Sequence, residues 1–187
     1  MGLFMDTGSV RSQLTQMNNH LDKVISQAEL LQGSVSAFTE TTKQLVGVSY
    51  DSMRNYYSST HLPAIRGLIC HVEELKAAND KYSTLIDTYL SGIGYVYEDG
   101  LGNSLDRIAR AREQDAAVTE LTVFMRSYDS LLWAMQRSIE YKLNKIAQFK
   151  AAASGIYSGV ESNMGLLQTG IDGVGFDSKT KTFSMRY

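Results

Sequence analysis

Apolar residues recur every three to four positions along three long stretches of this chain. In the first stretch, alternate steps of four and three residues lead from Val10 to Leu45 and meet only one polar residue, Thr42. An average spacing of 3.5 residues keeps one narrow face of a helix turned toward a neighbouring helix, as in a coiled coil. The pattern therefore predicts a long helix over about residues 9–46.

Two further stretches follow the same spacing. One runs from Leu68 to Ile93 with Asn79 as its polar exception, and the other runs from Val118 to Ala153 with Lys142 as its polar exception. We expect long helices over about residues 49–95 and 104–153, with a glycine-rich loop at residues 91–104 between them. A polar residue such as Asn79 in an apolar seam either fixes the register of paired helices or faces solvent, and the spacing leaves both interpretations open.

The chain reverses direction near Gly47, because a helix with an apolar face is most simply covered by folding the next helix back onto it. Glycine adopts positive φ without a steric penalty, and we expect Ser49 or Asp51 to cap the following helix. Pro63, the only proline, either begins a new helix after a break at residues 58–60, which we favour, or kinks a continuous one. The first two helices then form a helical hairpin.

Glycine becomes frequent after residue 153, which predicts a shorter and weaker helix over residues 154–168 and then a turn. The chain ends in GFDSKTKTFSMRY, whose alternation around a polar turn predicts a small β-hairpin. The fold class expected from the sequence is thus all-α: an elongated, coiled-coil-like bundle of long helices with a small carboxy-terminal hairpin.

Composition narrows the choice of partners. The chain has 20 acidic and 18 basic residues, so its net charge of −2 gives no general attraction for nucleic acid. No apolar run reaches the roughly 18 residues that a membrane span needs, and the amino terminus lacks the apolar core of a cleaved signal peptide. We therefore expect neither nucleic-acid binding nor stable membrane insertion.

Residues that carry catalytic or metal chemistry are few. The three histidines, His20, His61 and His71, form no HExxH or Glu-x-x-His pattern, and Cys70 is the single cysteine. The glycine-rich segments match neither a dinucleotide-binding nor a P-loop motif. We expect no catalytic residue, no metal and no cofactor, so the chain does not read as an enzyme; His61 is expected to pack at the hairpin tip or to cap a helix.

Three rods of this length hold more apolar surface than a chain of 187 residues is expected to cover. The seams of the first two helices are therefore candidate docking surfaces for helices of other proteins. A bundle that covers its own seams remains the alternative from periodicity alone. The candidate partner-binding residues are Leu14, Met17, Leu21, Val24, Leu31, Val35, Phe38, Val72, Leu75, Tyr82, Ile86 and Tyr89.

The segment LVGVSYDSMRNYYSSTHLPAIRGL, residues 45–68, resembles the signature region of LXG domains. Leu45 and Gly47 match the Leu-x-Gly motif, and the tyrosine-rich segment with HLP that follows is similar to its surroundings. The ending GIDGVGFDSKTKTF is also similar to the way in which LXG domains end, so the resemblance covers nearly all of residues 1–187. The residues assigned to the motif and the hairpin turn are Leu45, Gly47, Tyr50, His61 and Pro63.

The resemblance implies a function that composition and spacing do not supply. LXG domains are amino-terminal targeting domains of polymorphic toxins that type VII secretion systems of Gram-positive bacteria export. They resemble the small WXG-type helical hairpins and bind dedicated small α-helical proteins before export. By this resemblance, residues 1–187 form a single targeting domain without the toxic domain.

The resemblance also implies the partners and the route. We expect two different small α-helical adaptor proteins in a heterotrimer with this chain, and contact with the type VII ATPase or channel through that complex. The protein would be cytoplasmic before export and then secreted without a cleaved signal peptide. The alternative from the residues is a self-associating coiled-coil protein with no role in secretion.

Overall fold

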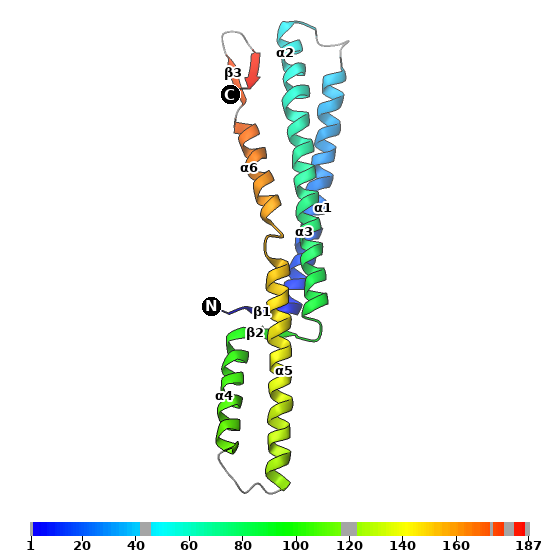
Figure 1. Ribbon diagram of the computed structural model, residues 1–187. Helices are drawn as coiled ribbons and strands as arrows, with labels where there is room; N and C mark the ends of the chain where they lie inside the picture. Colours follow the sequence, from blue (N-terminus) through cyan, green and yellow to red (C-terminus); the bar gives the residue numbers. More distant parts are fainter. Residues whose placement is uncertain (1, 42–45, 117–122, 173, 178–181, 186–187) are drawn as a thin grey trace. The chain divides into compact units, whose positions relative to one another are not determined.

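The computed structural model describes residues 2–41, 46–116, 123–172, 174–177 and 182–185. Most of these residues are helical, which confirms the all-α prediction. The helices are α1 (Thr7–Glu40), α2 (Val48–Tyr56), a π-helical segment (Tyr57–His61), α3 (Leu62–Tyr89), α4 (Glu98–Ala116), α5 (Val123–Ala153) and α6 (Ser158–Asp172) (Figure 1). Short strands form two separate antiparallel pairs, β1 (Phe4–Asp6) with β2 (Tyr95–Tyr97) and β3 (Val174–Asp177) with β4 (Thr182–Met185).

The chain divides into two compact units. The first unit comprises Met1–Gln13 and Tyr82–Ser154, and the second comprises Leu14–Lys81 and Gly155–Tyr187. The expectation of one targeting domain over residues 1–187 stays a prediction.

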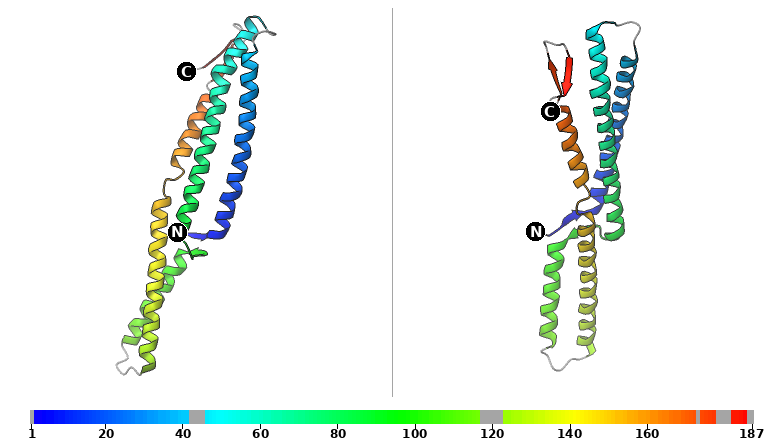
Figure 2. Two further views of the ribbon diagram at one scale, coloured as in Figure 1. Left: turned by 90° about the vertical axis from the view of Figure 1, so that its right-hand side faces the viewer. Right: turned by 45° about the horizontal axis from the view of Figure 1, so that its top comes forward.

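In the second unit, α1 and α3 run antiparallel and side by side (Figure 1, Figure 2). An ion pair joins Asp22 to Lys76 near one end of the contact, and Ala28 and Val35 of α1 share a buried cluster with Ile65 of α3 nearer the other end. The seven-residue interval between Ala28 and Val35 places both on one face of α1. Burying a valine or isoleucine side chain contributes about 1.5–3 kcal/mol, so this seam stabilises the predicted helical hairpin.

The reversal between α1 and α2 involves Gly47, as predicted. Gly47 has φ 130° and ψ 158°, a conformation that is essentially restricted to glycine, and it stands at the amino-terminal cap of α2. The prediction that Ser49 or Asp51 caps this helix is wrong, because Asp51 lies in its first turn and its backbone N–H donates to the carbonyl of Gly47. Helix α1 ends at Glu40 rather than near residue 46, and Leu45 lies outside the described residues.

The chain stays helical from Val48 to Tyr89, so the predicted break at residues 58–60 is wrong. Pro63 lies in the first turn of α3, directly after the π-helical segment Tyr57–His61. The proline ring crowds the carbonyl four residues earlier and offers that carbonyl no N–H. A wider π-helical turn before the proline changes the spacing of the preceding carbonyls and lets the helix continue.

Helix α6 lies along α3 in the second unit (Figure 1, Figure 2). Asn163 of α6 donates a hydrogen bond to the Oε2 of Glu74 at 2.7 Å, and a Cβ added to Gly67 would lie 3.1 Å from a methyl group of Leu167. The predicted carboxy-terminal β-hairpin is confirmed by the pairing of β3 with β4, and β4 lies against α2. Its predicted turn falls mostly on residues 178–181, outside the described residues.

The first unit contains a strand pair that the sequence reading missed. Phe4 of β1 is opposite Tyr97 of β2 in this antiparallel pair, and Phe4 contacts the rings of Tyr95 and Tyr97 edge to face. The Oδ1 of Asp6 then accepts hydrogen bonds from the backbone N–H groups of Gly8 and Ser9, which caps α1.

Helices α4 and α5 form a second hairpin within the first unit (Figure 1). The sequence reading is wrong here in two respects: residues 98–104 are helical rather than a loop, and the single helix predicted over residues 104–153 is instead two helices, α4 and α5. Gly100 does not interrupt α4, because its lack of a side chain makes room for the ring of Tyr97, which would lie 2.3 Å from an added Cβ. The seam residues Val118 and Leu121 lie outside the described residues.

Candidate functional site

The structure brings several predicted docking residues together inside the hairpin. Leu21, Val35 and Val72 are buried, at 9%, 7% and 5% exposure. In the second unit this seam also includes Ala28 and Ile65. These side chains stabilise the α1–α3 pair itself. The hairpin therefore buries several residues that the sequence analysis assigned to partner binding.

Other predicted docking residues remain accessible. Met17 is 47% exposed and Leu31 is 54% exposed, both on α1. Leu30, which the sequence reading did not select, is 74% exposed. Leu30 lies outside the heptad spacing of the seam. The adjacent pair Leu30 and Leu31 nevertheless indicated an accessible apolar residue, because neighbouring residues of a helix face different directions and cannot both lie in one narrow seam. The half-buried members of the predicted set are Leu14, Val24, Phe38, Leu75, Tyr82 and Tyr89.

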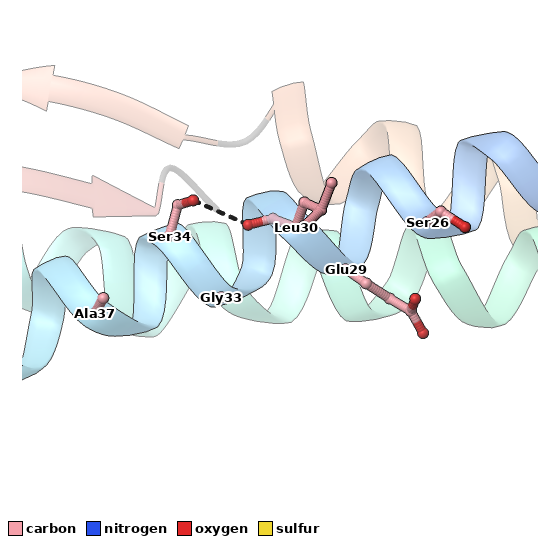
Figure 3. Close-up of a pocket in the computed structure, with 6 residues that line it drawn as sticks. All are labelled: Ser26, Glu29, Leu30, Gly33, Ser34 and Ala37. Carbon is pink, nitrogen blue, oxygen red and sulfur yellow. Dashed lines mark hydrogen bonds between the residues drawn. The ribbon is translucent and has the colours of Figure 1, made fainter.

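A shallow groove of about 710 Å³ runs along the side of α1 that carries Leu30, which we call the outer side of α1 (Figure 3). Figure 3 shows the side chains of Glu29 and Leu30 pointing away from one another, with small residues along the helix. The Oγ of Ser34 donates a hydrogen bond to the backbone carbonyl of Leu30 at 2.9 Å, which satisfies this hydroxyl within the helix. Residues lining the groove are Ser26, Glu29, Leu30, Gly33, Ser34 and Ala37; we call this set the α1 groove.

The α1 groove has the chemistry of a helix-packing surface. Small side chains let a second helix approach closely, and a Cβ added at Gly33 would meet nothing within 4 Å. Leu30 supplies an apolar side chain that a partner would remove from water. Glu29 places a negative charge at the rim of the α1 groove. A charge at such a position contributes more to the choice of partner than to affinity.

The tip of the hairpin holds an aromatic cluster. The ring of Tyr57 stacks on His61 at 4.6 Å between ring centres and meets Phe38 edge to face at 5.3 Å, while Tyr56 meets His61 at 4.9 Å. The prediction that His61 packs at the tip is confirmed. A cavity of about 240 Å³ adjoins this cluster, lined by Ser34, Val35, Phe38, Met53 and Tyr57.

Apolar side chains at the tip are also open to solvent. Val46 and Val48 are 76% and 82% exposed, and Tyr50, assigned to the motif, is 41% exposed. These residues flank Gly47, so the turn region presents apolar surface beside the cluster of Tyr57 and His61. Large exposed apolar patches usually mark interaction sites.

A buried polar network crosses the second unit. Asn79 of α3 is 1% exposed, and its Oδ1 accepts a hydrogen bond from the hydroxyl of Tyr157 at 2.9 Å. Its Nδ2 donates to the Oδ1 of Asn18 on α1, and the Nδ2 of Asn18 donates to the carboxylate of Asp80 at 2.7 Å. The interpretation that Asn79 faces solvent is therefore wrong.

Tyr82 and Ile86, two of the predicted docking residues, belong to the first unit and pack within it. Ile86 is fully buried, and the ring of Tyr82 meets Phe149 edge to face at 5.5 Å. Burial raises the pKa of the Tyr82 phenol, so this group stays neutral across the physiological range. These contacts give both side chains a role in the core of the first unit.

Glu98 connects the amino terminus to α4 and α5 in the first unit. Its carboxylate accepts hydrogen bonds from the backbone N–H of Leu3 at 2.7 Å and from the Nζ of Lys150 at 3.0 Å. The hydrogen bond from Leu3, and then that from Lys150, lower the pKa of Glu98 below its ordinary value. Sequence reading gave no sign of this contact, because the partners are far apart in the chain.

The described residues hold neither a candidate metal-binding cluster nor a helix that could span a membrane. Across those residues, no three His, Cys, Asp or Glu side chains are grouped so that they could hold a metal ion. Within the same ranges, no helix has the length and hydropathy needed to cross a bilayer.

Comparison with known proteins gives two matches. Residues 4–134 match the model of the LXG domain of the WXG superfamily. A protein named Toxin from Bacillus cereus is 25% identical over 190 residues, which cover 98% of this chain and 34% of that protein. This chain therefore spans about a third of the length of that relative. No solved structure matches the chain.

Proposed function

Because the chain belongs to the LXG domain family of the WXG superfamily, we propose that it directs a toxin to type VII secretion by binding small α-helical partner proteins. LXG domains are non-catalytic targeting domains of toxins secreted by the type VII route. We further propose that these partners dock on the α1–α3 hairpin.

The observation that carries the proposal is the exposure of Leu30 beside the small residues of the α1 groove. Leu30 and Leu31 are mostly accessible, although Leu21, Ala28 and Val35 of the same helix are buried. A partner can cover Leu30 without disturbing the packing of the hairpin. Removing this apolar side chain from water then favours association. A partner helix laid along the α1 groove would cover it.

The proposed contact is a helix-in-groove interaction. The partner helix would approach α1 closely at Gly33 and Ala37, with Leu30 inserted between its side chains. The exposed tip residues Val48 and Tyr50 would extend the contact toward the turn that carries the LXG motif. This assignment moves the docking surface from the buried seam residues to the outer side of α1.

Partner number and the later steps rest on the family resemblance. We propose two different small helical partners in a heterotrimer, with the complex, rather than this chain alone, recognised by the type VII ATPase or channel. The protein would be cytoplasmic before export and secreted without cleavage of a signal peptide. The relative named Toxin extends well beyond the part that matches this chain, which supports a separate toxic domain in the full protein.

The test is co-expression with the small helical proteins encoded beside the gene, followed by size-exclusion chromatography with light scattering. Leu30→Asp should weaken the complex by about tenfold or more, because a desolvated carboxylate replaces an apolar anchor. Ala77→Asp is the matched control, since it places the same charge on an exposed position of α3. Leu21→Asp is unsuitable, because Leu21 is buried and its replacement would disrupt the hairpin.

Three outcomes distinguish the possibilities. Co-elution that is lost with Leu30→Asp and kept with Ala77→Asp supports the proposal. Co-elution that survives Leu30→Asp removes the α1 groove as the docking surface. A tight dimer of this chain that takes up no partner supports the self-associating coiled coil instead.

A further inference from the structure

Helix α5 carries a regular row of aromatic and basic residues in the first unit. Four residues at intervals of four alternate between a ring and a cation: Trp133, Arg137, Tyr141 and Lys145. Residues four apart lie on the same side of a helix, with a small rotation at each step. We call this set the aromatic–cation row.

The row lies mainly on the side of α5 that faces solvent. Trp133 is 41% exposed and Tyr141 is 64% exposed, whereas the core residues Leu132 and Ile146 are 6% and 0% exposed. At 100° per residue, Arg137 is about 140° from Leu132 and about 180° from Ile146 around the helix axis. Both rings therefore leave a large part of their surface open to a partner.

Each cation of the row rests on a ring. The guanidinium of Arg137 lies 4.2 Å from the centre of the Trp133 ring, and the Nζ of Lys145 lies 5.7 Å from that of Tyr141. Arg112 of α4 also approaches Trp133 at 5.2 Å, and Lys145 approaches the ring of Tyr89 at 5.8 Å. Cation–π contacts of this kind hold the long side chains in place and reduce the entropy lost on binding.

Within the part of the chain that the structure describes, neither Arg137 nor Lys145 forms an ion pair, whereas Arg112 pairs with Asp129 and Lys150 with Glu98. The row therefore presents two positive charges eight residues apart, about 12 Å along the helix, beside two exposed rings. Arg, Trp and Tyr are the side chains most enriched among the energetically dominant residues of protein interfaces.

We propose that the aromatic–cation row binds an acidic amphipathic helix of a partner protein. Carboxylates eight residues apart on that helix would pair with Arg137 and Lys145, and apolar side chains between them would cover Trp133 and Tyr141. Charge complementarity selects this occupant, because the row itself is basic while the chain as a whole carries a net charge of −2. The surface belongs to the first unit and is separate from the α1 groove, so this inference does not depend on the proposed docking there.

Trp133 makes the test direct, because it is the only tryptophan in the chain and its fluorescence reports on the row. The probe is a synthetic amphipathic helical peptide with glutamates eight residues apart beside a row of leucines. The comparison peptide has each glutamate replaced by glutamine. Binding is measured by titration of the purified domain at low ionic strength, where charge pairing is least screened.

The double variant Arg137→Glu/Lys145→Glu reverses both charges of the row. Its control, Arg107→Glu/Arg110→Glu, makes the same change of charge at exposed positions of α4. We expect saturable binding of the glutamate peptide, about tenfold weaker binding of the glutamine peptide and of the row variant, and little change in the control. Circular dichroism of both variants verifies that the helices remain folded.

The proposal is overturned if the glutamate peptide leaves Trp133 fluorescence unchanged, or if both peptides or both variants bind equally. Vesicles containing phosphatidylglycerol serve as a further probe. A response to these vesicles without a response to the glutamate peptide would assign the row to an anionic membrane surface and would also overturn the proposal.

Discussion

Asn79 on α3 donates a hydrogen bond to Asn18 on α1, with 2.8 Å between the Nδ2 and Oδ1 atoms. Asn79 occupies a seam position that apolar spacing would reserve for a side chain such as leucine, and it is 1% exposed. A paired asparagine in a helical seam favours one alignment of the two helices, because any shift leaves a buried amide without a partner.

Replacing Asn79 by alanine should destabilise the second unit by about 1–3 kcal/mol, because Asn18 and Tyr157 each lose a buried hydrogen-bond partner. Asn19→Ala is the matched control, since Asn19 is an exposed asparagine next to Asn18 and its removal should change stability by less than about 0.5 kcal/mol. Urea unfolding followed by circular dichroism measures both. Equal midpoints for the two variants would show that the network contributes no stability.

Gly47→Ala tests the turn of the hairpin. The positive φ of Gly47 forces an alanine into a conformation that is unfavourable by about 1–3 kcal/mol, although nothing near the residue would obstruct its methyl group. The same substitution at Gly33, within α1 and also unobstructed, should instead raise stability by about 1 kcal/mol, because alanine is the better helix former. Opposite shifts in the urea midpoint are therefore expected, and a gain in stability for Gly47→Ala would contradict the observed backbone.

Glu98→Gln tests the link between the amino terminus and α4. The pKa of Glu98 is lowered in the folded protein, so the ionised carboxylate contributes stability above its unfolded pKa, and this contribution is lost as the pH falls through the folded value. The wild type should exceed the variant in stability at about pH 7 and approach it well below about pH 4. Urea midpoints across this range provide the measurement, and a difference that does not depend on pH would exclude an ionic role for Glu98.

The long helices could be predicted from the sequence because a seam such as Leu21, Ala28 and Val35 repeats over many turns. The residues at which these helices end, and the π-helical turn within one of them, could not be predicted in the same way. Pro63 suggested a break, but the chain accommodates it with a π-helical turn, a solution that local propensity does not favour. Gly100 suggested a loop, because the sequence does not reveal that the ring of Tyr97 takes the place of its side chain.

The candidate site was predicted only in part. Periodicity identifies residues that face another helix but does not say whether that helix belongs to the same chain, so Leu21 and Val72 were assigned to partners although they pack inside the protein. Leu30 was passed over because it lies off the seam. The hydrogen bond from the backbone N–H of Leu3 to the carboxylate of Glu98 joins residues far apart in the sequence, so no local sequence pattern predicts it.

The side chains of Leu21, Ala28 and Val35 are covered within the protein, and we propose that the α1 groove is left for a partner. Hydrogen–deuterium exchange of the domain, alone and in complex with its co-expressed small helical partners, tests this division. We predict that the amides of α1 and α3 already exchange slowly in the free domain and that binding slows exchange further, chiefly over residues 26–37. Fast exchange throughout α1 and α3 in the free domain, or a complex in which exchange over residues 26–37 is unchanged, would show that this assignment is wrong.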